Sequence, residues 1–200
     1  MQFNHYGGEA ARLAADLVNA ASDTAPDSAP GSDPGPAPVP DLDLVLAAHG
    51  VHRPPLTGAA RRALLRWAAD GLSPCFAAVA AHREAAERAA ALAARCARVN
   101  ALLAAASTQP RISLHDGHPH LHYGPDDRDA VAHVKASTAA ALAYVVCFAG
   151  AHRLGRCARA GCARAYVDTS RGGRRAYCSV RCANNDAVAR HRARHPGTRP

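Results

Sequence analysis

Four cysteines near the end of the chain lie in two close pairs. Their pattern is Cys157-x4-Cys162-x15-Cys178-x3-Cys182. Zinc prefers four thiolate sulfurs arranged as a tetrahedron, and two short-spaced pairs supply them once the intervening segment brings the pairs together. Four thiolates leave no coordination position for water, so we expect one structural Zn2+ rather than a hydrolytic centre. The alternative interpretation is a set of buried free thiols or a redox pair.

The sequence between the two pairs predicts the elements that must position them. ARAYVD (residues 163–168) and RRAYCS (residues 174–179) flank Ser-Arg-Gly-Gly, whose glycines suit a tight turn. We therefore expect a hairpin that follows a loop bearing Cys157 and Cys162 and that ends at Cys178. Cys182 is expected in the first turn of a final helix, where backbone amides and nearby arginines favour thiolates.

Positive charge is concentrated in the same part of the chain. Residues 153–200 carry 12 arginines and two acids, a balance of +10, whereas residues 1–152 carry 12 basic residues and 14 acids, a balance of −2. This segregation predicts a polyanionic partner for the C-terminal module, and we expect that partner to be DNA. The candidate contacts are Arg171, Arg174, Arg175, Arg181, Asn184, Asn185, Arg190, Arg192 and Arg194.

The two residue types among these candidates suit different parts of a DNA duplex. Guanidinium groups hold phosphates, whereas asparagine amides pair with adenine in the major groove. On a helix, Arg181, Asn185 and Arg192 fall near one face. Aromatic residues make up only 4% of the chain, so base stacking is not the expected mode of recognition. The alternatives are a solvated basic face, or a zinc-stapled module that binds a protein or RNA without sequence-specific DNA binding.

Residues 1–152 predict a mainly α-helical domain ahead of this module. Apolar periodicity predicts helices over residues 8–22, 41–50, 56–71 and 73–107, and another that is capped by Asp126 or Asp127 and runs towards Leu154. We expect Gly71 to end the third of these helices. The apolar face of the fourth is expected to contain Leu92, Cys96, Val99 and Leu103.

Two segments of this domain depart from the helical pattern. Residues 24–40 carry six prolines and predict an exposed, flexible loop. Residues 111–124 predict a β-hairpin, because apolar residues alternate on both sides of an Asp-Gly turn signal. Four histidines crowd this hairpin: His115, His118, His120 and His122. The last three share one face, away from Leu121 and Tyr123, and such a face is either solvated or able to take a metal.

The module from Arg156 onwards, RCARAGCARAYVDTSRGGRRAYCSVRCANN, resembles the CGNR-type zinc finger of bacterial stress-induced transcription regulators. GGEAARLAADLVNA and HREAAERAAAL resemble the ABATE-type domain that precedes this finger. The resemblance implies zinc ligation by the four cysteines, an Asp-x-Ser turn at Asp168 and Ser170, and roles for Arg174 and Arg175. Where the family has Gly-Asn-Arg after the fourth cysteine, this chain has Ala183, Asn184 and Asn185, and Tyr177 replaces a common tryptophan.

Together these patterns predict a mainly α protein of two parts. Residues 1–152 form a helical, ABATE-like domain with one small β-hairpin, and residues 153–200 form a small treble-clef-like zinc module with a hairpin and a C-terminal helix. The resemblance implies that the first part senses a small-molecule ligand or forms a homodimer. The predicted function is a zinc-containing, DNA-binding transcription regulator.

Several other classes of function are not expected. The chain shows no nucleophile beside a base, no paired carboxylates and no phosphate-binding glycine loop, so we do not expect an enzyme. The start of the chain lacks the basic and apolar regions of a secretory signal. The longest apolar run, residues 139–151, is short for a membrane span. We expect a cytoplasmic, nucleoid-associated protein in which clustered thiols bind metal.

Overall fold

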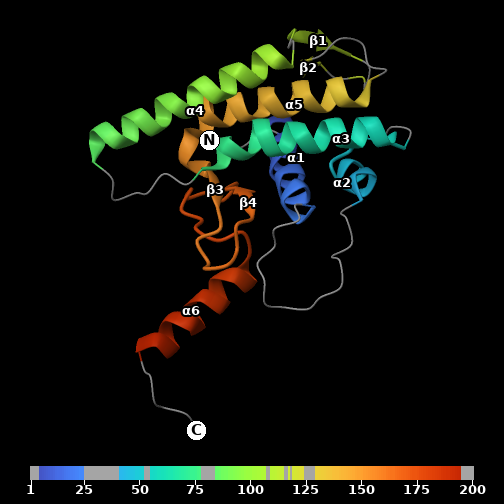
Figure 1. The fold of residues 1–200 in the computed structure, drawn as a ribbon. Coiled ribbons are helices and arrows are strands. Elements are labelled where there is room, and N and C mark those ends of the chain that lie inside the picture. Colours follow the sequence, from blue (N-terminus) through green and yellow to red (C-terminus); the bar gives the residue numbers. More distant parts are fainter. Residues whose placement is uncertain are drawn as a thin grey trace.

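A computed structural model shows a mostly helical body from which a small cysteine-containing module and a terminal helix extend (Figure 1). The structure describes residues 5–24, 41–51, 55–77, 84–106, 109–114, 117, 119–123 and 129–194. Most of the expected proline-rich loop, residues 25–40, lies outside the described residues. The mainly α fold class is confirmed, and the described residues contain two small antiparallel strand pairs.

Helix α1 (His5–Asp23) lies at the centre of the body, as the periodicity of residues 8–22 predicts. Its apolar face is fully buried, with Leu13, Leu17 and Val18 all at 1% exposure or less. This face packs against α5 (Ala130–Tyr144) and against strand β4 (Ala165–Val167) of the cysteine module. The first helix therefore joins the helical body to the part of the chain that carries the cysteines.

Helices α2 (Leu42–Ala48) and α3 (Gly58–Arg66) begin at side-chain caps. Asp41 accepts a hydrogen bond from the backbone N–H of Asp43 at 3.0 Å, and Thr57 accepts one from Ala60 at 3.2 Å. Such caps satisfy the backbone donors that the first turn of a helix leaves without partners. The two short helices cover the outer side of α1.

The prediction that Gly71 ends the third helix is wrong. After α3 the chain continues as a π-helix, η1 (Trp67–Leu72), and then as a 3-10 turn, η2 (Ser73–Phe76). A Cβ atom at Gly71 would lie 2.8 Å from Cδ2 of Leu102. The glycine therefore allows close packing against the next long helix and does not end the helical run.

That next helix, α4 (Ala85–Ala105), is shorter than the predicted helix over residues 73–107. The prediction is wrong at its start, because Ser73–Phe76 belong to η2 and Ala77 turns the backbone to an extended conformation. Residues 78–83 lie outside the described residues. The predicted apolar face is correct at Val99, whereas Leu92 is 47% exposed and Leu102 is buried.

The buried face of α4 also contains a charged side chain, Arg95, which is only 3% exposed. Its guanidinium donates to the backbone carbonyls of Ala77 and Ala151. Burial lowers the pKa of this guanidinium, and the two carbonyls offset the cost of removing it from water. Arg95 thus ties α4 to the ends of η2 and of the helical run that follows α5.

Helix α5 is capped by Asp129, which accepts a hydrogen bond from the N–H of Val131 at 2.9 Å. Asp126 and Asp127, the predicted caps, lie outside the described residues. The helix continues through a π-helix, η3 (Val145–Gly150), and a 3-10 turn, η4 (Ala151–Arg153). By length and composition alone this 24-residue run could cross a membrane, but a core helix passes the same test, and α5 packs against α1, α3 and α4.

The predicted β-hairpin exists, but a solvated histidine face, one of the two alternatives, is not found at His120 and His122. Strands β1 (Arg111–Ser113) and β2 (His120–His122) pair antiparallel, with Ile112 opposite Leu121. Ile112 and Leu121 are 73% and 52% exposed, whereas His120 and His122 are buried. The ring of His122 lies 5.2 Å from that of His120 and 6.2 Å from that of His133 on α5. His115 and His118 lie outside the described residues.

Candidate metal centre and finger

The Sγ atoms of Cys157, Cys162, Cys178 and Cys182 all lie within 4.8 Å of one another. Cys162 is 3.8 Å from Cys178 and from Cys182, and Cys178 is 3.5 Å from Cys182. A zinc tetrahedron with Zn–S bonds of about 2.3 Å has edges of about 3.8 Å. A disulfide would need about 2.05 Å, and all seven cysteines are free. The donor set therefore fits a structural zinc ion, and the interpretation as a redox pair is not needed.

The first two ligands lie on the loop of a hairpin that the sequence did not predict. Strand β3 (Leu154–Arg156) pairs antiparallel with β4, so the loop between them carries Cys157 and Cys162. The N–H of Cys157 donates to the carbonyl of Arg164 at 2.9 Å, and that of Cys162 donates to Arg159 at 3.0 Å. Gly161 has a φ of +75°, which this tight loop requires.

The predicted hairpin between residues 163–168 and 174–179 is wrong in its second strand. Residues 174–177 form no strand, and β4 pairs with β3 instead. Residues 174–177, here called the returning segment, lie beside the loop between β3 and β4. A backbone hydrogen bond joins the two, from the N–H of Ala158 to the carbonyl of Ala176 at 2.8 Å. The returning segment thus brings Cys178 to the other ligands without extending the sheet.

Helix α6 (Val180–Arg194) supplies the last ligand from its first turn, as predicted. Ser179 precedes the helix, and its hydroxyl accepts a hydrogen bond from the N–H of Cys182 at 3.2 Å. A separate interaction of the Ser179 side chain with the sulfur, together with the guanidinium of Arg159 3.9 Å away, lowers the pKa of Cys182 to about 6, whereas burial raises the pKa of Cys178 to about 12. A thiolate is the form that binds zinc, so the environment of Cys182 favours metal binding at this ligand.

Asp168 organises the turn between β4 and the returning segment. It is 1% exposed, and its carboxylate accepts hydrogen bonds from the N–H groups of Ser170 and Arg175 at 2.9 and 2.8 Å. Burial acts to raise the pKa of Asp168, but hydrogen bonds from the Ser170 side chain and from these two N–H groups, together with the charge of Arg153, outweigh it and hold the pKa below its usual value. The Asp-x-Ser turn that the family resemblance implies is therefore formed.

Arg175, a candidate DNA contact, is engaged within the finger. Its Nε donates to the carbonyl of Tyr177 at 2.7 Å, and its Nη2 donates to the carbonyl of Cys178. The guanidinium also lies 5.2 Å from the ring of Tyr166, whose hydroxyl donates back to the carbonyl of Arg175 at 2.5 Å. Gly155, opposite Tyr166 in the sheet, leaves room for that hydroxyl. Arg175 therefore positions the loop of the third zinc ligand.

The other candidate contacts lie on the surface of the module. Arg171 and Arg174 are exposed on the turn, and the candidate residues of α6 are exposed along that helix: Arg181, Asn184, Asn185, Arg190, Arg192 and Arg194. Arg190 pairs with Asp186 at 3.2 Å, and Asp186 also accepts a hydrogen bond from Tyr177 at 2.8 Å. Tyr177, which stands where the family commonly has tryptophan, thus connects the third ligand's loop to α6.

The first half of the module is fixed to the helical body by residues that sequence reasoning missed. Asn19 of α1 is 6% exposed and bonds both the N–H and the carbonyl of Ala165, at 2.8 and 3.1 Å. Arg153 donates to the carbonyls of Ala149, Asp168 and Ser170. Leu154 and Val167 join the main hydrophobic core. The only sequence signal was a polar residue at position 19 on an otherwise apolar helix face.

Fold and site together define a small zinc finger with four cysteine ligands, attached to a helical body. Residues 153–195 match the CGNR zinc finger family. No curated protein matches the chain. The part of the resemblance that concerns the finger is thus confirmed, including the ligand-bearing region, although the chain reads Cys-Ala-Asn-Asn at residues 182–185.

Proposed function

We propose that the finger binds duplex DNA and that the chain acts as a transcription regulator. The observation that carries the proposal is helix α6, which extends away from the helical body (Figure 1). Cys182 is its only buried residue, and most of the rest of its surface is exposed. Because α6 packs on little of its own protein, internal contacts do not explain why it is polar and basic. Binding to a polyanion would explain this composition.

The charges on the finger support this partner. Arg171 and Arg174 present two guanidinium groups on the turn, and α6 presents Arg181, Arg192 and Arg194. Binding of about four to six phosphates would give a slope of log K against log salt near −4 to −5. Asn184 and Asn185, exposed on the first half of α6, are the side chains that suit base contacts.

Zinc would have a structural role here rather than a catalytic one. When bound by the four cysteines it fixes the first loop, the returning segment and the start of α6 as one unit, with no coordination position left for water. This supports a binding function over an enzymatic one. The helical body would sense a ligand or form a homodimer, as its resemblance to ABATE-type domains implies, and the protein would act in the cytoplasm at the nucleoid.

Binding of the zinc-loaded full chain to a random duplex library, followed by enrichment and sequencing, tests the proposal. A recovered consensus supports a sequence-specific regulator despite Asn185 in place of the family's arginine. Salt-sensitive binding without a consensus supports a non-specific DNA binder. Absence of binding overturns the proposal and favours a finger that contacts RNA or a protein, which competition with RNA then separates.

A matched pair of variants tests whether the finger is the contact surface. Arg171→Gln combined with Arg181→Gln removes two exposed charges from the finger. Arg62→Gln combined with Arg66→Gln removes two exposed charges from α3 of the helical body. The first pair should reduce the salt slope by about 2 and the second should leave it unchanged, because the slope counts phosphates neutralised at the contact.

A further inference from the structure

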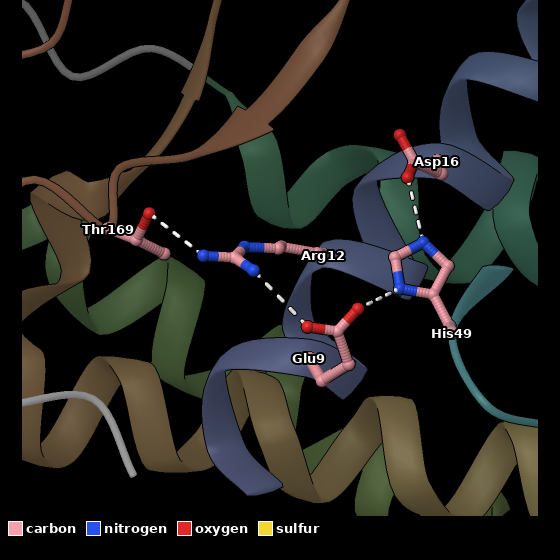
Figure 2. Close-up of polar contacts among 5 residues, drawn as sticks. All are labelled: Glu9, Arg12, Asp16, His49 and Thr169. Carbon is pink, nitrogen blue, oxygen red and sulfur yellow. Dashed lines mark hydrogen bonds and ion pairs between the residues drawn. The ribbon is translucent and has the colours of Figure 1, made fainter. Parts of the chain in front are cut away.

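A chain of five polar side chains crosses from the end of α2, over α1, to the finger (Figure 2). His49 lies between the two carboxylates of Glu9 and Asp16, with Nδ1 2.8 Å from Glu9 and Nε2 2.9 Å from Asp16. Arg12 donates to the other oxygen of Glu9 at 3.2 Å and to the hydroxyl of Thr169 at 3.3 Å. We call this set the His49 relay.

The imidazole of His49 can hold both carboxylates only in one protonation state. The His49 side chain is only 7% exposed, whereas Glu9 and Asp16 are 34% and 52% exposed. An imidazolium donates from both ring nitrogens, whereas a neutral imidazole donates from one and presents a lone pair at the other. A lone pair facing a carboxylate oxygen at under 3 Å is repulsive. The geometry therefore matches protonated His49, and loss of the proton must release one of the two contacts.

The far end of the relay lies where the proposed DNA contacts begin. Thr169 lies between Asp168 and Ser170, the two residues that build the finger's turn, and Arg171 follows directly. Arg12 is the link, because a single guanidinium bonds Glu9 on one side and Thr169 on the other. Anything that moves Glu9 changes the position of Arg12 and thus the support of this turn.

We propose that the His49 relay is a proton-operated coupling between the helical body and the arginine-bearing turn of the finger. Protonated His49 fixes Glu9 and Arg12, and Arg12 holds Thr169. Deprotonation releases one of the two carboxylates. Release of Glu9 frees Arg12 and loosens the turn, so the affinity of the finger for a polyanion falls as pH rises. This last step rests on the proposed DNA binding, whereas the coupling itself does not.

The charges around the relay favour the protonated form of His49. The hydrogen bond to Asp16 is the largest influence and raises the pKa of His49; burial opposes it, and Glu9 adds to the increase. On α2, Asp41 and Asp43 pair instead with Arg61 of α3, at 3.5 and 2.6 Å. On the finger side, Arg164 pairs with Asp23 of α1 at 3.8 Å. These acidic groups therefore have partners other than His49.

The coupling is tested first without DNA, by NMR titration of the zinc-loaded full chain between pH 5 and 9. The backbone amides of Thr169 and Ser170 should shift with the same midpoint as the His49 ring. In Arg12→Gln, His49 should still titrate while the two amides no longer follow it. Arg12 is about half exposed, so this variant should fold normally. Amides that ignore His49 in the unchanged chain, or that still follow it in Arg12→Gln, overturn the coupling.

Binding of a duplex at constant ionic strength then tests the consequence for the finger. The affinity of the unchanged chain should fall about two- to fivefold more between pH 6 and 8.5 than that of Arg12→Gln, because exposed ion pairs couple weakly. Arg62→Gln, a charge-matched control on α3, should behave like the unchanged chain. Equal pH dependence in all three overturns the regulatory step. Complete absence of DNA binding contradicts the proposed function instead, and leaves the NMR result as the test of the coupling.

Discussion

Asn19 of α1 pairs with Ala165 of β4 as a neighbouring strand would, donating to its carbonyl and accepting from its N–H. One amide side chain therefore satisfies the backbone of a strand whose other edge is taken by β3. Because Asn19 lies 146 residues earlier in the chain, this pair fixes the base of the zinc finger to the first helix of the body. The finger is thus held against the helical body by direct contacts as well as by the continuous chain.

Replacing Asn19 with alanine should destabilise the protein by about 2–4 kcal/mol, since two hydrogen bonds are lost and two buried backbone groups lose their partners. The free energy of unfolding from urea titration measures the effect. Asn100→Ala, at an exposed position of α4, is the matched control and should cost little. Similar free energies of unfolding for the two variants would contradict a role for Asn19 in holding the finger against the body.

Neighbouring arginines on the finger should have different roles. Arg175→Gln should weaken zinc binding by about 10–100-fold, because Arg175 holds the carbonyls of Tyr177 and Cys178, and groups that orient ligands have effects of this size. Arg174→Gln removes the same charge from an exposed side chain and should leave zinc affinity unchanged while weakening DNA binding. Competition with a chromogenic chelator measures the zinc affinity. Equal zinc affinities would show that Arg175 does not position the ligand loop.

The four ligands and most helices could be predicted because their signals are local. Two cysteine pairs need only short spacing, and an amphipathic helix needs only its own periodicity. The pairing of β3 with β4 could not be predicted in this way, since three-residue strands carry little pattern and the pairing depends on α1 packing against β4. The same holds for Asn19, whose partner is distant in the chain.

The β1–β2 hairpin shows a different limit of sequence reasoning. Alternation at residues 120–123 correctly separated the histidines from Leu121, but alternation alone does not say which face lies against the body. In the structure His120 and His122 are buried near His133 on α5, whereas Leu121 is 52% exposed. The prediction that Gly71 ends a helix was wrong for a similar reason, because the role of this glycine depends on the approach of Leu102 from another helix.

The stability of the protein should depend on pH through His49. Its pKa is raised in the folded state by Asp16 and Glu9, so folding gains the most when His49 is protonated in both states. That contribution is complete below the unfolded pKa near 6.5 and is lost as pH rises through the higher folded pKa. Urea titrations at pH 5.5 to 8.5 should show a decline that His49→Gln reduces, since glutamine does not titrate in this range. An unchanged decline in the variant would assign the pH dependence to other groups.

Loss of the zinc site should unfold only part of the chain. Cys178→Ser, or removal of zinc with a chelator, should release the segment after Ser170 together with α6, because without the metal that segment keeps isolated hydrogen bonds such as those of Ala176 with Ala158 and of Arg175 with Asp168. The β3–β4 pair should remain, since Leu154 and Val167 lie in the main core and Asn19 holds Ala165. Residues 5–150 should therefore keep their fold.

Hydrogen exchange read by mass spectrometry separates the two outcomes of that experiment peptide by peptide. Fast exchange should be confined to residues 171–194, with α1, α5 and β4 as protected as in the unchanged chain. Cys147→Ser is the matched control, since Cys147 is an exposed cysteine outside the metal site, and it should change neither zinc content nor exchange. Fast exchange in α1 as well would mean that zinc stabilises the body through β4. The hydrogen bonds between Asn19 and Ala165 would then depend on the metal.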